Sequence, residues 1–529
     1  MKKIFKYFMI SAVVFGASSC KKFLDVNTNP NSLTQATPAL VLPQAIVSSA
    51  AISNTFSLSL ADFSGARANA GGFGGFGAVV TYDFGTDAYS NLWTSTYDNA
   101  NDYQYVIDNT SADAALVFST SIARIMKSFA FERLVDQFND VPYSEALKGT
   151  ASLTPKYDAA PDVYKACIAE LDKSITDITA GLANVSTTKI TASTDPMFGG
   201  NMSLWAKFAN TVKLRMLIKM ANVPEYSSYT TTAFTGMNLT VGFLSTDAIV
   251  NPGYVKTDRP NPVYSSIGWT STGTVTTTAR IPTKWIYSFY NGGKLADTYR
   301  ASVIYRGFPS TIINQMGDES SGVPAAAAAG SAWNTGDANS TQLGLTKGPT
   351  MGTPVLLATE SEFLQAEAFA RGYLAGSAQA AFDRGITQSF TYLYKDVSNS
   401  VSATKNVTAD VAAYKATNIA AAPKPYLVDY TLAVGFSQQL EAIITQKYIA
   451  LNMISNNEAF NDFRRTEFPS IVNGSLDPVA TFASRQSVST HADKLPTRVL
   501  YPQEEFNLNP SNVPQNINKF SSLIFWDLR

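Results

Sequence analysis

Apolar residues recur at helical spacing in six long stretches of this sequence, and this pattern restricts the possible folds more than any other feature. In residues 355–376, Leu356, Phe363, Ala366, Ala370 and Tyr373 lie three, four or seven positions apart. Residues at these spacings fall on one face of an α-helix, so the stretch predicts an amphipathic helix that buries this face. A glycine, which is common just past a helix end, interrupts the pattern at the end of the stretch.

The next stretch, residues 377–394, repeats the pattern with Phe382, Ile386, Phe390 and Leu393 on one face. Two such helices joined by a short turn form an antiparallel pair of roughly 34 to 40 residues, the size of a tetratricopeptide unit, although the consensus of that repeat is not met. Similar stripes occupy residues 120–138, 161–178, 203–221 and 436–454. Because the pairs are dispersed along the chain, we predict a mainly α fold: a tetratricopeptide-like helical-repeat scaffold built from separated hairpins.

Helical spacing is lost between about residues 226 and 350, where Thr, Ser, Gly, Pro and Tyr dominate. Long irregular segments in compact proteins are usually functional, so we predict an irregular, loop-rich ligand-binding lobe inserted in the helical scaffold. Exposed aromatic rings beside amides suit sugars, because a ring stacks on the C–H face of the sugar while the amide bonds its hydroxyls. The candidate ligand-binding residues in this lobe are Tyr264, Trp269, Trp333 and Asn334, with Tyr254 and Trp285 nearby in the sequence.

Residues 71–77 read GGFGGFG and contain a literal G-x-G-x-x-G. A dinucleotide-binding fingerprint needs a strand before it and a helix after it, and the sequence predicts neither. We interpret the segment as a loop, here called the Gly/Phe loop, that exposes Phe73 and Phe76 to a ligand. Residues 25–36 begin like a calcium-binding loop, but Pro30 and Ala36 stand where that loop needs Gly and Glu.

The N-terminus has the pattern of an export signal. Three lysines precede FMISAVVFGA, an apolar run of about ten residues that is short of the roughly 20 a membrane-spanning helix needs. Small residues then lead into Cys20, and Gly-Ala-Ser-Ser-Cys resembles a bacterial lipobox, which implies cleavage before Cys20 and lipid attachment to it. We therefore predict a lipoprotein signal peptide in residues 1–19, a lipidated cysteine and flexible tether in residues 20–35, and one domain in residues 36–529. A plain signal peptide is the alternative, and we expect no other run to be apolar enough to cross a membrane.

Residue counts exclude several classes of protein. The chain has one histidine, His491, so a zinc site with several histidines is impossible, and no G-x-S-x-G nucleophile elbow occurs. We expect His491 at the surface and Cys167, which lies on an apolar stripe, to be a buried small residue. The 40 basic and 41 acidic residues nearly cancel, which argues against nucleic acid as a partner. We predict no cofactor and no metal.

Several segments, in order along nearly the whole chain, resemble one family. They are the lipobox with KKFLDVNTNP, LVDQFNDVPYSEAL (134–147), LWAKFANTVKLRMLIKMA (204–221), IITQKYIALNMISNNEAFNDFRRTEFP (443–469) and LPTRVLYPQEEFNLNP (495–510). Together they resemble the SusD/RagB family of nutrient-binding outer-membrane lipoproteins. The resemblance implies a tetratricopeptide-like scaffold, no enzymatic activity, and a position as lid on a SusC-like TonB-dependent transporter at the cell surface, where the protein captures glycans or peptides. It also implies that the helix in NLWTSTYDNANDYQYVID begins beside the ligand site, which adds Trp93 and Asn99 to the candidates.

Some of these motifs have a structural interpretation of their own. Arg464 and Arg465, near a helix end, can cap carbonyls and pair with carboxylates, and Arg215 lies on one helical face with Trp205 and Phe208. Two other functions stay open from the residues alone. One is a glycan-active hydrolase that uses two carboxylates, and the other is a structural protein whose repeats dock partners. The carboxylates that a hydrolase would most simply use are Asp83, Asp87 and Asp98.

Overall fold

The computed structural model describes residues 36–327 and 330–529 of the chain. The predicted signal peptide, the predicted lipidation site Cys20 and the predicted tether lie outside the described residues.

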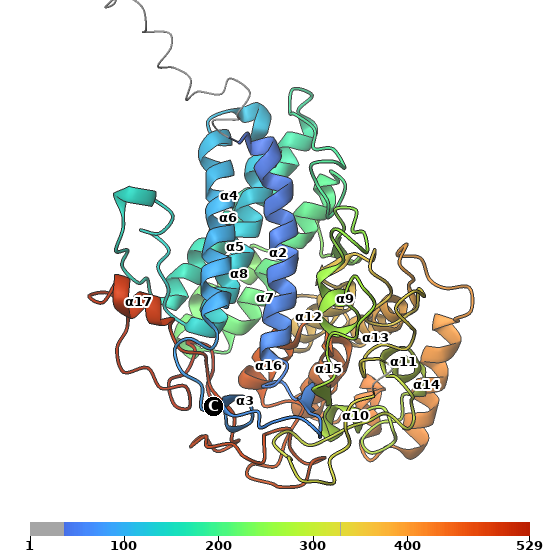
Figure 1. Ribbon diagram of the computed structural model, residues 1–529. Coiled ribbons are helices and arrows are strands. Elements are labelled where there is room, and N and C mark those ends of the chain that lie inside the picture. The colour runs from blue at the N-terminus through green and yellow to red at the C-terminus, as the bar shows by residue number, and fades with distance from the viewer. Residues whose placement is uncertain (1–35, 328–329) are drawn as a thin grey trace, which may run out of the picture.

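Long helices stand side by side in one half of the molecule (Figure 1). Each packs on the next in sequence, α2 on α4, α4 on α5, α5 on α6 and α6 on α7. The predicted stripes at 120–138, 161–178 and 203–221 correspond to the last three of these helices. Their bounds are α2 Pro38–Leu60, α4 Ser90–Thr110, α5 Val117–Phe138, α6 Ala160–Ala183 and α7 Met202–Ala221.

A second group of helices forms the other half. The predicted antiparallel pair is present as α12 and α13, which pack closely on each other, and α12 also contacts α15 and α7. The contact between α12 and α7 joins the two halves of the molecule, although these helices are far apart in sequence. The bounds of this group are α12 Ala358–Ala370, α13 Ala378–Tyr394, α14 Val407–Ala421, α15 Gly435–Leu451 and α16 Asn456–Thr466. The short helix α17 (Gln503–Leu508) lies apart from this group, on the side of α4 (Figure 1). The mainly α fold predicted from the periodicity is confirmed.

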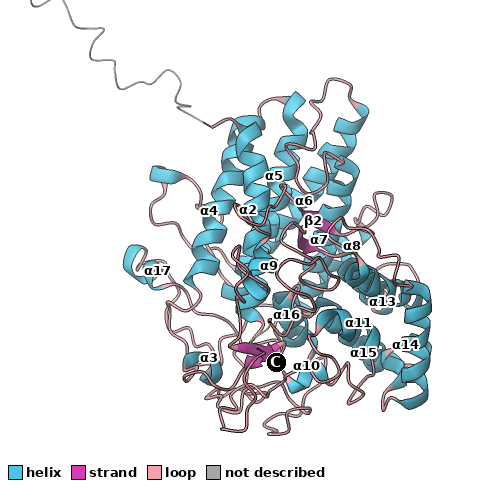
Figure 2. Cartoon of the chain, turned by 45° about the vertical axis from the view of Figure 1, so that its right-hand side comes forward, coloured by secondary structure: helices cyan, strands magenta, loops and turns pink. Residues whose placement is uncertain are grey.

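The segment between residues 226 and 350 consists mostly of loops, drawn in pink in Figure 2. Its described residues hold only short helices, α8 Ser227–Thr235, α9 Pro262–Ile267, α10 Lys284–Tyr287 and α11 Thr298–Ile304. Two antiparallel strand pairs tie this segment to the rest of the chain. β1 (Arg67–Asn69) pairs with β3 (Arg280–Pro282), and β2 (Ala248–Val250) pairs with β4 (Thr353–Leu356).

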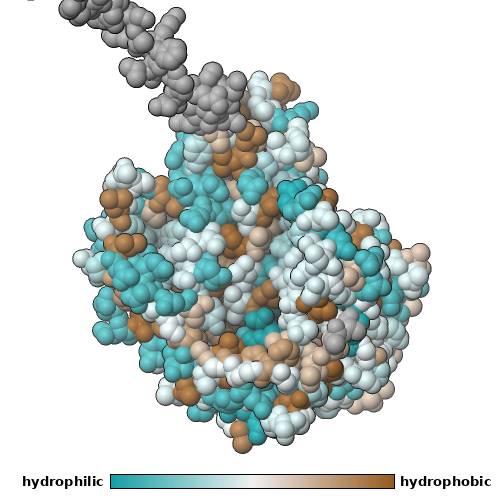
Figure 3. All heavy atoms as spheres, viewed as in Figure 1, coloured by the Kyte–Doolittle hydropathy of each residue, from teal (hydrophilic) through white to brown (hydrophobic). Residues whose placement is uncertain are grey.

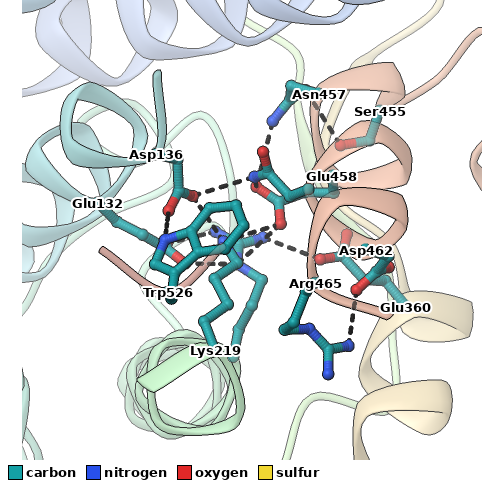
Figure 4. A network of polar contacts seen from close by, with 12 residues as sticks. Glu132, Asp136, Lys219, Glu360, Ser455, Asn457, Glu458, Asp462, Arg465 and Trp526 are labelled. Atoms are coloured by element: carbon teal, nitrogen blue, oxygen red, sulfur yellow. Dashed lines mark hydrogen bonds and ion pairs between the residues drawn. The ribbon is translucent and has the colours of Figure 1, made fainter. Parts of the chain in front are cut away.

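Buried ion pairs join helices from both halves (Figure 4). Arg215 on α7 donates to Glu132 on α5 (2.5 Å) and to Glu360 on α12 (2.9 Å). One turn later, Lys219 lies 2.6 Å from Asp136 and 3.0 Å from Glu458 on α16. Buried charges are tolerated only when they are paired and hydrogen-bonded, so this network fixes how α5, α7, α12 and α16 pack.

The structural interpretation of the two arginines on α16 is confirmed. Arg465 binds both carboxylate oxygens of Glu367 on α12, at 2.5 and 2.7 Å. Arg464 donates to the backbone carbonyls of Thr497 and Asp136. Both side chains are buried, and their partners join α16 to α12, to α5 and to the C-terminal segment.

Three smaller expectations have different outcomes. Cys167 is fully buried, as predicted. His491 is partly exposed, with 19% of its side chain accessible, and its Nδ1 lies 2.7 Å from Asp493 Oδ1. The expectation about apolar runs is wrong. Within the described residues, α2 and the segment Ala114–Phe138 are both long and apolar enough to span a membrane, although they pack against the other long helices of the fold.

Candidate ligand-binding site at the Gly/Phe loop

The Gly/Phe loop is held at one end by the irregular lobe. Gly71 N donates to Pro324 O (3.0 Å), and Gly71 forms a parallel bridge with Ala325. The approach of the two backbones is so close that a Cβ on Gly71 would lie 2.0 Å from Val323 O. Only glycine fits this position, which explains why the loop begins with that residue. The tip differs, because a Cβ on Gly74 would meet nothing within 4 Å.

The two phenylalanines of the loop differ in exposure. Phe73 is 44% exposed. Phe76 is half-buried on a small apolar cluster formed by Ala68, Val80 and Met316. Its backbone N–H donates to Glu319 Oε1 (3.1 Å), and Gln486 in turn donates to the second oxygen of Glu319 (2.8 Å). Phe76 is therefore held by the apolar cluster and by its hydrogen bond to Glu319, whereas Phe73 is exposed to solvent.

One guanidinium group lies beside the Phe76 ring, and it shares a carboxylate with a second guanidinium group. Asp62 Oδ1 accepts from Arg67 Nε (2.9 Å), and Asp62 Oδ2 accepts from Arg280 Nη2 (2.6 Å). The Arg280 guanidinium carbon lies 5.4 Å from the centre of the Phe76 ring. The exposed fractions of the side chains are 18% for Arg67, 12% for Arg280 and 6% for Asp62. The cluster thus carries one more positive charge than negative charge in a partly desolvated place.

Arg280 retains a hydrogen-bonding group that the protein does not use. Its Nη1 is buried and has no acceptor among the residues that the structure describes. Burial lowers the pKa of Arg280, and Asp62 opposes this effect. Because leaving a buried donor unpaired is costly, Nη1 is suited to an acceptor that a ligand brings.

Tyr89 adds a hydroxyl near the same charges. Its ring packs on Phe63 and Phe84, with ring centres 5.7 and 5.0 Å apart. Burial and then the nearby Asp62 raise the pKa of Tyr89 above its usual range, so the hydroxyl stays protonated and can donate.

The cluster and the loop lie low on the face shown in Figures 1 and 3. The N-terminal segment that carries α3 (Ala78–Thr81) runs across this face below α2. The space-filling view is hollowed between the upright helices and the lower part of the molecule, and hydrophilic residues occupy the hollow (Figure 3). An aromatic ring, a free guanidinium N–H and an exposed second ring together can hold a polar ligand with an apolar face, such as a sugar.

The other six predicted site residues are buried, and the expectation that the aromatic rings of the irregular lobe are exposed is wrong. Trp93 and Asn99 are 5% and 3% exposed, and the four candidates of the irregular lobe are at most 2% exposed. Their contact with a ligand stays a prediction. Their burial has an identifiable cause in each case.

Trp93 and Asn99 are part of the packing between α4 and its neighbours. The Trp93 ring centre lies 5.0 Å from that of Phe138 and 5.9 Å from that of Tyr501. Asn99 donates to Ala45 O on α2 (2.9 Å) and accepts from Ser49 Oγ (2.6 Å). These contacts join α4 to α2, to α5 and to the C-terminal segment.

The four candidates of the irregular lobe are buried in two different places. Tyr264 and Trp269 pack with Met351 as a separate small cluster. Trp333 belongs to the main core, and Asn334 Oδ1 accepts from Gly336 N (3.0 Å). An irregular segment can bury its rings without any periodic stripe, and this is why sequence spacing did not indicate burial.

The flanks of the G-x-G-x-x-G also differ from the prediction. The three-residue strand β1 precedes the segment and the single helical turn α3 follows it. The pattern still lacks the context of a dinucleotide site, because β1 pairs antiparallel with β3 and not in a parallel β-α-β unit.

Sequence reasoning missed Asp62, Arg67, Tyr89 and Arg280. The sequence offered only a weak signal for these four residues. They are ionisable and lie close to predicted loops, and ionisable side chains stand out in this chain because only 15% of its residues are charged. The candidate carboxylates of the hydrolase hypothesis, Asp83, Asp87 and Asp98, are all exposed, and Asp83 pairs with Lys519 Nζ at 2.7 Å.

Comparison with protein families identifies the class. The sequence pattern of the SusD-like family, described as "Susd and RagB outer membrane lipoprotein", matches residues 31–523. The chain therefore belongs to this family of outer-membrane lipoproteins, whose members bind nutrients. A comparison with curated proteins found no match.

Solved structures show the same fold. A chitin-binding protein is similar with a TM-score of 0.65 and 22% identity, over 93% of this chain and 100% of that chain. A SusD homolog from Bacteroides uniformis has a TM-score of 0.66 and 21% identity, over 92% and 99% of the two chains. A chitin-binding SusD homolog from Flavobacterium johnsoniae has a TM-score of 0.68 and 19% identity, over 92% and 98%.

Proposed function

We propose that this protein is a lipid-anchored, surface-exposed outer-membrane protein that binds oligosaccharides at the Gly/Phe loop site and delivers them to a SusC-like TonB-dependent transporter. It acts by binding and release, without catalysis. Membership of the SusD-like family supports the location and the nutrient-binding role. Peptides are the second class of ligand that the family resemblance allows.

One observation carries the choice of site: Phe76 lies beside a guanidinium with an unused N–H, and the exposed Phe73 belongs to the same loop. A ring stacked on a ligand contributes about 1 kcal/mol, by analogy with aromatic pairs. Two rings and a few hydrogen bonds give dissociation constants of roughly micromolar to millimolar. Such affinity suits a protein that must release its cargo into a pore.

Chitin oligosaccharides are the first ligands to test. Two of the similar solved structures are described as chitin-binding. The repeating sugar of chitin carries an acetamido carbonyl, which can accept from Arg280 Nη1, and a C–H face, which can stack on Phe76. Neither feature requires a charged ligand.

The test is calorimetric titration of residues 21–529 with chitin oligosaccharides, other glycans and peptides. We expect Phe73→Ala and Phe76→Ala each to weaken glycan binding about fivefold, the factor that corresponds to about 1 kcal/mol. The melting temperature of Phe73→Ala should change little. Phe436→Ala is the matched control, because Phe436 is exposed to a similar extent (42%) but lies on α15.

Each other result has a definite meaning. Unchanged affinity in both loop variants would overturn the site. Saturable binding of peptides alone would assign the other ligand class. Release of shorter glycans would establish a hydrolase, and absence of any binding would favour a structural protein.

A further inference from the structure

A cavity of about 140 Å³ lies between the middle of α15, the chain just after α14, the chain just after α16 and the segment that follows α10. It shares no residue with the Gly/Phe loop site. Its apolar wall is made of Phe289, Leu427, Pro423 and Pro469, and its polar groups come from Lys294, Lys424, Glu441, Thr445 and Ser470. A cavity of about 150 Å³ is known to hold a benzene ring, so this one accepts a ligand of ring size.

Lys294 is the unusual residue of the wall. Its Nζ is buried, lies 2.8 Å from the centre of the Trp285 ring and 4.8 Å from that of Phe289, and has no hydrogen-bond partner within the described part of the chain. The backbone holds it there, since Lys294 N donates to Ser288 O at 2.7 Å. Burial lowers the pKa of Lys294 to about 6, and Lys424 acts in the same direction, whereas Asp477 and Glu441 oppose it.

Another buried lysine, Lys347, shows how an amine in this fold can have its hydrogen bonds filled by the protein itself. Lys347 is even more deeply buried than Lys294, but its Nζ donates to Tyr392 O (2.8 Å) and to Lys395 O (2.6 Å). Lys294 has rings around it in place of these carbonyls. The difference is therefore specific to the cavity and is not a general property of buried lysines here.

The carboxylate in the cavity does not serve as the missing partner. Glu441 already accepts from Lys424 Nζ (2.5 Å), Tyr426 OH (2.6 Å) and Ser470 Oγ (3.3 Å). Its charge is compensated by Lys424. The amine of Lys294 consequently remains available to an acceptor that enters the cavity from outside.

We propose that this cavity is a second binding site, for a small organic carboxylate with an apolar body about as large as one ring. The carboxylate accepts from Lys294 Nζ, and the body packs on Phe289, Leu427 and the two prolines. An anion restores the charged form of a desolvated amine, whereas a neutral ligand of the same shape gains only the apolar contacts. The site thus selects charge as well as size.

Proton uptake follows from this arrangement. In the free protein at pH 8 the Lys294 amine is mostly neutral, and pairing with a carboxylate raises its pKa, so binding takes up a proton. Affinity is greatest near pH 6 and falls about tenfold for each pH unit above it, until the pKa of the complex is reached. The charged and titratable groups that act on Lys294 are Lys424, Glu441, Asp477 and, through its hydrogen bond to Glu441, Tyr426.

Benzoate is the probe, with benzyl alcohol as the neutral ligand of the same shape. We expect benzoate to bind residues 21–529 with one site, with proton uptake in calorimetry when two buffers of different ionisation enthalpy are compared at pH 8. Lys294→Met should weaken benzoate at least tenfold at pH 6 and abolish proton uptake. Lys347→Met should leave both unchanged, and benzyl alcohol should bind weakly without dependence on pH.

The proposal is overturned if benzoate does not bind, if Lys294→Met binds it as tightly as the natural protein, or if binding takes up no proton. The last measurement uses the natural protein alone, so the proposal stays testable if a variant folds poorly. None of these outcomes depends on whether the Gly/Phe loop binds glycans.

Discussion

At the scale of single residues, Glu367 shows how a buried charge is held in this fold. It accepts from Arg465 at 2.5 and 2.7 Å and from Arg371 Nε at 2.7 Å. Burial alone would raise its pKa, but the two guanidiniums dominate and hold the pKa at about 2, below its ordinary value of 4.5. The pKa is lower in the folded state, so the stabilisation is complete above pH 4.5 and is lost as the pH falls toward 2.

We therefore expect Glu367→Gln to lower the free energy of unfolding by about 3–5 kcal/mol at pH 7, because it leaves Arg465 buried without its full counter-charge. Denaturant titrations at pH 7 and pH 3 measure the free energy of unfolding. When the pH is lowered from 7 to 3, Glu367→Gln should lose less stability than the natural protein does. Glu170→Gln is the control: Glu170 pairs with Arg124 at 3.2 Å but is 35% exposed, so its loss should cost less than about 1 kcal/mol. A Glu367→Gln protein as stable as that control would contradict the argument.

At the scale of elements, the sequence predicted helices where large apolar residues recur at helical spacing, as they do in α5, α6, α7, α12, α13 and α15. It missed α2, because many buried residues of that helix are small, such as Ala45 and Ser49, and Pro43 lies within it. The charged part of the candidate site was unpredictable for another reason, since Arg280 and its partner Asp62 are 218 positions apart. Only the fold brings them together, whereas the Gly/Phe loop is local and was predicted.

The Gly/Phe loop gives a prediction at the same scale. Gly71→Ala places a Cβ against Val323 O, so the loop must move away from the irregular lobe. We expect glycan affinity to fall at least as far as in Phe76→Ala, and limited proteolysis to cut the loop faster, while the melting temperature changes little. Gly74→Ala is the control, because it makes the same chemical change at a position where the added Cβ meets nothing within 4 Å. This variant should behave as the natural protein does. Equal proteolysis of the two variants would show that the Gly71 contact does not order the loop.

At the scale of the whole molecule, the question is what attaches it to the membrane. α2 and the segment Ala114–Phe138 are apolar enough to span one, but 39% and 61% of their apolar windows are buried inside the fold. α5 also carries Glu132 and Asp136 of the buried network, so neither helix can enter a bilayer without breaking the contacts between α2, α4, α5 and α7. The attachment is then expected outside the described residues. Cys20 precedes Ala36, the first described residue, by sixteen positions, a reach of at most about 55 Å.

We expect Cys20→Ala to move the protein from the membrane fraction to the soluble fraction, because stable anchoring requires more than one acyl chain and this cysteine is their predicted attachment point. Its melting temperature should equal that of the natural protein, since the change lies outside the folded domain. Cys167→Ala is the matched control: Cys167 is the other cysteine, and it is fully buried on α6, so this variant should stay with the membranes. Cell fractionation with high-salt washing, followed by thermal denaturation of each purified protein, measures both. If Cys20→Ala remained membrane-bound after such washing, the anchor would be a protein surface, and the exposed Leu40 at the start of α2 would be the first place to look for it.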